Sequence, residues 1–291
     1  MLRPLVLLLL PAVAAAAAPP CRFASLDGLG VHYQYFGEGS HAVVFIHGWT
    51  CDLTFWRGQA PLYQKRRSLL IDLPGHGASD RPPEASYSQE LFARAVEAVM
   101  RDAGVEKATL VGHSMGGPVA LTFARLYPAK TAAVVLVDAF VPRLPKDDAE
   151  REKALAAGAE RLKVWREPDY KTAFAKSVDG MFVASTPEPL RAEIRTKMML
   201  TPQHVVASAM AGMVALAKLR PEDLKFDVPA LAISANRGKP RPGYEDYLRT
   251  IFPKLQGSVE MEGVGHFLMM EQPEKFNAVL GPFLERDASS R

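Results

Sequence analysis

The sequence Gly112-His113-Ser114-Met115-Gly116 stands between an apolar run at 108–111 and a stretch with helical spacing at 117–127. This pattern predicts a strand, a tight turn and a helix in immediate succession. Glycines flank the turn because a Cβ there would collide with the neighbouring helix or strand. The turn is expected to hold the Ser114 hydroxyl above the sheet, beside the free N–H groups of a helix N-terminus. This arrangement is typical of a nucleophilic serine whose reaction develops an oxyanion.

Strand and helix signals alternate on both sides of this turn. Apolar strand candidates recur at 42–46, 68–72, 108–111, 132–137, 230–234 and 258–261. Helix-like stretches lie among them at 89–101, 118–126, 244–252 and 273–284. The segments 23–25 and 31–35 flank Asp27-Gly28, which predicts a hairpin. Runs that are apolar on both faces suit a parallel sheet, so we predict an α/β fold with a doubly wound, mostly parallel sheet.

The alternation stops between Arg143 and Lys225, where the sequence is charged, helical in pattern and without strand signals. We interpret 143–225 as a helical cap inserted after the sixth strand, which divides the core into 21–142 and 226–291. The cap carries large apolar side chains at Trp165, Phe174, Met181, Phe182, Met198, Met199, Met210 and Met213. Methionine is adaptable, so these side chains either line an apolar pocket or only pack the cap helices onto the sheet.

Composition sets limits on the class of protein. The chain has 291 residues, 48% hydrophobic and 23% charged, which suits a soluble domain with a large core. A net charge of +3, without a basic stripe carrying interleaved aromatics, gives no reason to expect a nucleic-acid or anionic-membrane partner. No cluster has zinc-ligand spacing and no glycine-rich phosphate loop occurs, so neither a metal nor a cofactor is expected.

The first twenty residues predict an export signal. Met1-Leu2-Arg3 is basic, 5–10 is apolar and 14–18 is built of small residues, which predicts a signal peptide over 1–20 cleaved near 16–18. The apolar stretch is short of the about 20 residues that a membrane span needs. We therefore expect a periplasmic or extracellular protein. Cys21 would suit a lipoprotein, but Pro19 and Pro20 fit badly before a lipidated cysteine, so export as a soluble protein is favoured.

Cys21 and Cys51 are the two cysteines of the sequence. In an oxidising compartment two cysteines invite a disulfide. The other interpretation is one exposed thiol near the terminus and one half-buried thiol. The sequence leaves both possibilities open.

Three further segments accompany the serine turn in a fixed order. They are Phe45-Ile46-His47-Gly48-Trp49, Asp72-Leu73-Pro74-Gly75-His76-Gly77-Ala78-Ser79, and Val264-Gly265-His266-Phe267 followed by Glu271-Gln272-Pro273. Together with 112–117 they resemble the capped serine hydrolases of the α/β-hydrolase superfamily, over nearly the whole chain after residue 20. The resemblance implies the α/β-hydrolase fold and chemistry that needs no cofactor.

The resemblance also implies roles for individual residues. A serine hydroxyl is a poor nucleophile without an adjacent base. His266 lies in the loop where the family keeps its catalytic histidine, and would take the proton from Ser114 and return it to the leaving group. The backbone N–H groups of Trp49 and Met115 would form the oxyanion hole. In the family, His47 braces the oxyanion loop.

The other two histidines of these motifs are not expected to act as the base. His113 flanks the nucleophile, and His76 is interpreted as a structural loop residue.

The carboxylate that should orient His266 departs from the family pattern. The usual aspartate follows the seventh strand, where this sequence has Gly238. Asp138, at the end of the predicted strand 132–137, is the favoured replacement, since some capped members carry their acid after the sixth strand. A carboxylate there also lies on the functional edge of an open α/β sheet. Glu245 and Asp246 are alternatives, as is a site without an acid and with low activity.

Serine at position 114 argues against haloalkane dehalogenases and epoxide hydrolases, which use an aspartate nucleophile on this scaffold. We expect hydrolysis of a carboxylic ester or lactone of a small apolar acyl substrate through an acyl-enzyme. Thioesters and peptides with a small N-terminal residue belong to the same acyl-transfer class. Two alternatives stay open: carbon–carbon hydrolysis of ring-cleavage products, and a non-catalytic ligand-binding protein with this fold.

Overall fold

The computed structural model describes residues 21–39, 41–238 and 241–289 of the chain. The predicted signal peptide, 1–20, lies outside the described residues.

One sheet of eight strands forms the centre of the described structure, in the order β1-β2-β4-β3-β5-β6-β7-β8. The strands are β1 (Cys21–Leu26), β2 (Leu29–Phe36), β3 (Ala42–Ile46), β4 (Ser68–Ile71), β5 (Ala108–His113), β6 (Thr131–Val137), β7 (Ala230–Asn236) and β8 (Leu255–Glu262). β1 and β2 form the predicted hairpin, β2 pairs antiparallel with β4, and all other pairs are parallel.

The sheet order places two functional loops beside each other. The chain runs outward from β3 to β4 and then returns to place β5 on the other side of β3. Ligands of open α/β sheets bind at such a reversal, outside the carboxyl ends of the strands. Ile46 at the end of β3 is in register with Gly112 on β5. The loop after Ile46 and the turn carrying Ser114 therefore leave the sheet as neighbours.

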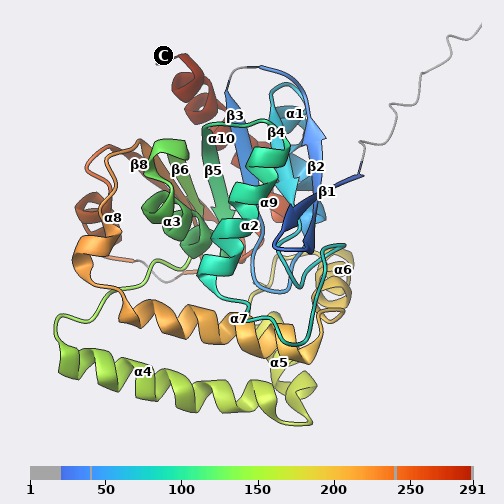
Figure 1. Cartoon of the computed structure of the whole chain (residues 1–291), viewed down its shortest axis with the longest axis vertical. Helices are drawn as coiled ribbons and strands as arrows, with labels where there is room; N and C mark the ends of the chain where they lie inside the picture. The colour runs from blue at the N-terminus through green and yellow to red at the C-terminus, as the bar shows by residue number, and fades with distance from the viewer. Residues whose placement is uncertain (1–20, 40, 239–240, 290–291) are drawn as a thin grey trace, which may run out of the picture.

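Helices cover both faces of the sheet (Figure 1). α2 (Gln89–Asp102) and α3 (Gly116–Leu126) pack together on one face. The opposite side carries α1 (Ala60–Tyr63), α9 (Leu268–Glu271) and α10 (Pro273–Ser289), and α8 (Tyr244–Ile251) packs against β8. Because both faces are covered, every residue of β3 to β6 is buried, as the doubly apolar strand pattern requires. The predicted doubly wound α/β fold is confirmed.

Four α-helices occupy the stretch between β6 and β7 and lie together beyond one end of the sheet (Figure 1). They are α4 (Asp148–Leu162), α5 (Tyr170–Asp179), α6 (Glu188–Met198) and α7 (Gln203–Ala215). The two long helices, α4 and α7, run side by side. Gly158 permits this close approach, because a Cβ on it would lie 2.3 Å from Cγ1 of Val214. We call these four helices the cap.

Both cysteines are free thiols in this structure, Cys21 exposed and Cys51 buried, so the disulfide alternative does not hold here. Among the described residues, no single helix has the length and apolar character to cross a bilayer. One bent pair of helices, Glu188–Met198 with Gln203–Lys218, is long and apolar enough when the two are taken together, by length and composition only.

Candidate active site

Ser114 sits on a strained turn between β5 and α3. Its φ of 52° lies in the left-handed region, which non-glycine residues seldom adopt. Its N–H donates to the carbonyl of Val137 at 3.0 Å, which ties the turn to the end of β6. Its carbonyl accepts from the Gly117 N–H at 3.1 Å, which begins the helix. The strain is therefore held by hydrogen bonds to two separate elements.

The glycines around the serine are required by close backbone approach. A Cβ on Gly112 would lie 2.3 Å from the carbonyl oxygen of Gly116. A Cβ on Gly116 would lie 2.4 Å from the carbonyl oxygen of Ile46, and one on Gly117 would lie 2.3 Å from Cβ of Ala139. The strand, the turn and the helix can pack this tightly only without these side chains.

The loop after β3 runs directly against Ser114. A Cβ on Gly48 would lie 3.0 Å from Cβ of Ser114. His47 braces this loop: its Nδ1 donates to the carbonyl of Gly48 at 2.8 Å, and its Nε2 accepts from the Leu73 N–H at 3.0 Å. Burial lowers the pKa of His47, which keeps the imidazole neutral and able to accept that hydrogen bond.

The two predicted oxyanion donors flank the serine. Trp49 and Met115 line the same cavity as Ser114. Within the described part of the chain, neither backbone N–H donates a hydrogen bond to another group. Both donors are therefore available to a negative oxygen beside Ser114.

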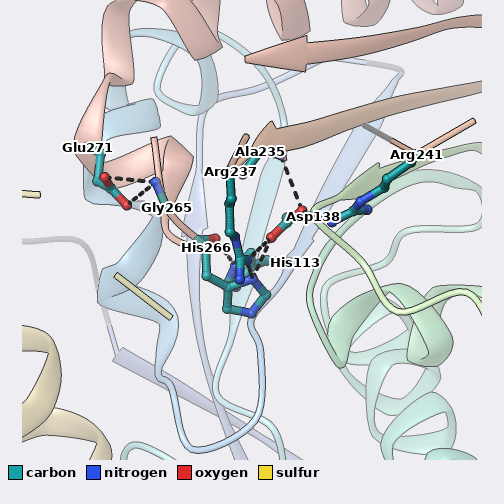
Figure 2. A network of polar contacts seen from close by, with 8 residues as sticks. All are labelled: His113, Asp138, Ala235, Arg237, Arg241, Gly265, His266 and Glu271. Carbon is teal, nitrogen blue, oxygen red and sulfur yellow. Dashed lines mark hydrogen bonds and ion pairs between the residues drawn. The ribbon is translucent and has the colours of Figure 1, made fainter. Parts of the chain in front are cut away.

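His266 and Asp138 meet although 128 residues separate them in the chain (Figure 2). Nδ1 of His266 lies 2.6 Å from Oδ2 of Asp138. An ionised carboxylate only accepts hydrogen bonds, so Nδ1 carries the proton and Nε2 is the basic ring nitrogen. The two alternative acids lie elsewhere: Glu245 and Asp246 are exposed on α8, and Glu245 pairs with Arg249. Asp138 is thus the carboxylate that the fold brings to His266.

Asp138 is held in a dense set of donors. Its side chain is 1% exposed. Oδ2 also accepts from Nη2 of Arg237 at 2.5 Å, whereas Oδ1 accepts from Nη2 of Arg241 at 3.0 Å and from the Ala235 N–H at 3.2 Å. Burial raises the pKa of this carboxyl, but the hydrogen bond and charge of His266 and the two guanidinium groups outweigh it. The resulting pKa lies well below its usual range, so the carboxylate stays ionised.

The two arginines are the site residues that the sequence analysis missed. Nη2 of Arg237 lies 3.0 Å from Nδ1 of His266, but both atoms are donors and both point to the same oxygen of Asp138 (Figure 2). A signal was present: Arg237 and Arg241 follow β7 at the functional edge, where the family keeps its acid. Two positive side chains at this edge need a nearby negative partner, and that partner must come from another strand because no carboxylate stands at the usual position after β7.

The loop that carries His266 is fixed from two sides. Nε2 of His113 lies 2.9 Å from the carbonyl of His266, and burial lowers the pKa of His113 to about 3. A neutral His113 thus donates to this loop and does not serve as a base. On the other side, both oxygens of Glu271 accept from the Gly265 N–H at 3.0 Å. His76 is buried and bonds the carbonyl of Pro74, as expected of a structural loop residue.

A cavity of about 480 Å³ lies between the sheet and the cap, and Ser114 and His266 both line it. Its wall is mostly apolar and includes Trp49, Cys51, Met115, Phe140, Met181, Met198, Met210, Met213 and Phe267. Four of the predicted cap methionines therefore face the cavity. Trp165 and Phe174 instead pack on Trp49, with ring centroids 5.2 and 5.1 Å away. The four methionines therefore line the pocket, whereas Trp165 and Phe174 pack the cap against the rest of the protein.

Across residues 21–39, 41–238 and 241–289, no three His, Cys, Asp or Glu side chains lie together in a way that could hold a metal ion.

Comparison with known proteins identifies the fold family. Residues 41–273 match a family model described as the alpha/beta hydrolase fold. Over 277 residues the chain is 28% identical to a 2-hydroxy-6-oxononadienedioate/2-hydroxy-6-oxononatrienedioate hydrolase of Burkholderia vietnamiensis, covering 89% of this chain and 92% of the relative. Other curated relatives match at 33% to 40% identity over shorter stretches, and the chain spans only 32% to 44% of their length.

Solved structures agree. An esterase from Thermogutta terrifontis is 28% identical with a TM-score of 0.73, covering 94% of this chain and 100% of its own. An enol-lactonase from Burkholderia xenovorans LB400 is 25% identical with a TM-score of 0.75, covering 91% of this chain and 100% of its own. Because the family model spans well over half of the sequence and the sheet agrees with it, the chain belongs to the α/β-hydrolase fold family.

Proposed function

We propose that this hydrolase cleaves a carboxylic ester or lactone of a small apolar acyl substrate through an acyl-enzyme on Ser114. The observation that carries the proposal is the 2.6 Å contact between His266 and Asp138, at the cavity that Ser114 also lines. A serine on a strained turn, a histidine with a fixed tautomer and a buried ionised acid are the three parts that acyl transfer requires.

The proposed steps follow from these positions. Ser114 Oγ attacks the carbonyl carbon while Nε2 of His266 takes its proton. Asp138 stabilises the imidazolium that forms, because its carboxylate is already ionised. The Trp49 and Met115 N–H groups bind the oxyanion, and each such donor contributes about 3 kcal/mol to the transition state. The imidazolium then protonates the leaving alcohol, and water hydrolyses the acyl-enzyme by the same route.

The cavity and the relatives support an ester or lactone substrate. The wall of methionine and aromatic side chains suits an apolar acyl group. The similar esterase and enol-lactonase cover almost the whole chain.

A second candidate reaction is carbon–carbon hydrolysis. It is favoured by the similarity to the 2-hydroxy-6-oxononadienedioate/2-hydroxy-6-oxononatrienedioate hydrolase over 89% of this chain. The same Ser114, His266 and Asp138 would serve that reaction.

The test is hydrolysis of p-nitrophenyl esters from acetate to long acyl chains by the wild type and Ser114→Ala. We expect the wild type to hydrolyse these esters and Ser114→Ala to lose this activity without unfolding. Ser86→Ala, which replaces an exposed serine, should keep the activity. Fluorophosphonate labelling should follow the same pattern, since it needs an activated serine. Turnover that survives Ser114→Ala contradicts the assignment. If no ester is hydrolysed but Ser114 is labelled, carbon–carbon hydrolysis is favoured. If no ester is hydrolysed and Ser114 is not labelled, a ligand-binding role is favoured.

We also propose that the protein is exported, on the basis of the pattern in residues 1–20. N-terminal sequencing of the mature protein from fractionated cells tests this. A mature chain that begins near residues 17–19 in the periplasm or medium supports export, whereas an intact Met1 in the cytoplasm contradicts it.

A further inference from the structure

A second hollow, of about 410 Å³, opens at Ser114 and His266 on the side of the loop after β7. Its charged lining consists of Asp138, Arg237 and Arg241, together with the titratable His266. The other described residues that line it carry no charge at neutral pH. With His266 neutral, one carboxylate faces two guanidinium groups, which leaves this side of the site with one excess positive charge.

Positive side chains also line the larger cavity. Arg143 and Arg161 line that cavity, and none of the described residues in its lining is an aspartate or glutamate. Arg143 lies over the ring of Tyr247 at 5.3 Å. Charge of one sign in a cleft with apolar walls raises the local concentration of ligands of the opposite sign. Among the described residues, the linings of both hollows beside Ser114 therefore carry an excess of positive side chains.

The two arginines of the hollow are held in place yet keep unused donors. Each guanidinium has five N–H donors. Among the described residues, Asp138 accepts from both guanidinium groups, Arg241 also has a hydrogen bond to the Tyr244 side chain, and the buried Nε of Arg237 has no acceptor. Their side chains stay 31% and 36% exposed, and Arg241 stacks on Tyr244 at 5.5 Å. They are fixed in position without being covered, as preorganised anion-binding groups are.

We propose that Arg237 and Arg241 form a carboxylate-binding subsite beside Ser114, so that the natural ester or lactone carries, besides its apolar acyl chain, a carboxylate away from the scissile bond. This inference rests on the proposed function, because it describes the substrate of the same serine. The arginines thereby act twice, toward Asp138 with one face and toward the substrate with the other.

Matched substrates test the subsite. One pair places the charge on the acyl side: p-nitrophenyl hydrogen adipate against p-nitrophenyl methyl adipate. The other places it on the alcohol side: 3-carboxyphenyl butyrate against 3-carbamoylphenyl butyrate. We expect kcat/KM to be about 10-fold or more higher for the carboxylate in one pair, the size expected of hydrogen bonds to a charged group. The preference should fall at high salt.

The variant Arg241→Gln separates the two roles of the arginine. It keeps a donor for Asp138 but removes the charge, so the preference for the carboxylate substrate should fall about 10-fold, the worth of that charge–charge contact. Arg249→Gln is the matched control, because it removes the same charge from an exposed residue of α8 that pairs with Glu245. It should keep the preference.

Three outcomes overturn the subsite: no preference in either pair, equal loss for charged and neutral substrates in Arg241→Gln, or the same loss in Arg249→Gln. If no ester is hydrolysed, the proposed reaction fails, and titration calorimetry of Ser114→Ala with adipate and dimethyl adipate tests the subsite alone. Tighter binding of adipate that Arg241→Gln weakens supports it, and equal binding overturns it.

Discussion

Replacing Asp138 with asparagine is the sharpest perturbation that the site offers. The two carboxylate oxygens accept from four donors: His266 and Arg237 on Oδ2, and Arg241 and the Ala235 N–H on Oδ1. An asparagine has one oxygen and one NH₂ group, so one of these two pairs of donors must face another donor. No orientation of the amide restores the native set of hydrogen bonds.

Each orientation has its own cost. If the NH₂ group faces His266, Nδ1 must accept, the proton moves to Nε2, and the ring can no longer take the proton of Ser114. If the NH₂ group faces Arg241 and Ala235, the tautomer survives, but two donors lose their acceptor and the imidazolium loses its counter-charge. Loss of the charged acid in a serine triad costs about 10⁴ in kcat, roughly 5.5 kcal/mol. We expect a loss of about 10³- to 10⁴-fold here.

The assay is p-nitrophenyl ester hydrolysis at equal protein concentration, with folding checked by circular dichroism. Asp246→Asn is the matched control, since Asp246 is exposed on α8 and is the alternative acid of the sequence analysis. It should stay within about twofold of the wild type, as surface substitutions do. A folded Asp138→Asn enzyme with more than about a tenth of wild-type activity would contradict the role of Asp138 as the acid, and the reverse ranking would move the acid to α8.

Two further predictions concern stability. The hydrogen bond to Asp72 raises the pKa of the buried His32 above its usual 6.5, so its stabilising effect is complete below that value and is lost as pH rises through the raised pKa. His32→Gln should therefore lower the Tm more at about pH 6 than at about pH 9, and a pH-independent loss would contradict this. Gly116→Ala should cost about 1–3 kcal/mol in urea unfolding, because its Cβ would lie 2.4 Å from the Ile46 carbonyl oxygen. Gly281→Ala on α10, where the Cβ meets only the far end of a side chain at 3.4 Å, should instead be neutral or stabilising.

The central strands and the serine turn were predictable from sequence because their causes are local. Strand β3 covers the residues of its predicted apolar run, and β6 begins one residue earlier than predicted. A strand with apolar side chains on both faces can bury all of them only in the middle of a sheet that helices cover on both sides. The glycines around Ser114 are similarly predictable, because the backbone of the strand and that of the helix approach closely within a few residues of the turn.

The acid and its arginines depend on the tertiary structure. Asp138 and His266 are 128 residues apart, and the position of Asp138 at a strand end favoured it without excluding Glu245 and Asp246. The pairing of β6 with β7 and of β7 with β8 decides it, because it places the ends of the three strands at one edge. The same pairing turns Arg237 and Arg241 toward a carboxylate on a strand that precedes the cap. Sequence thus determined which turns and strands form, since those follow from sterics and burial of neighbouring residues. Only the sheet order decided which charged groups meet, since Coulomb energy and hydrogen bonds act over a few ångströms of space, whatever the distance along the chain.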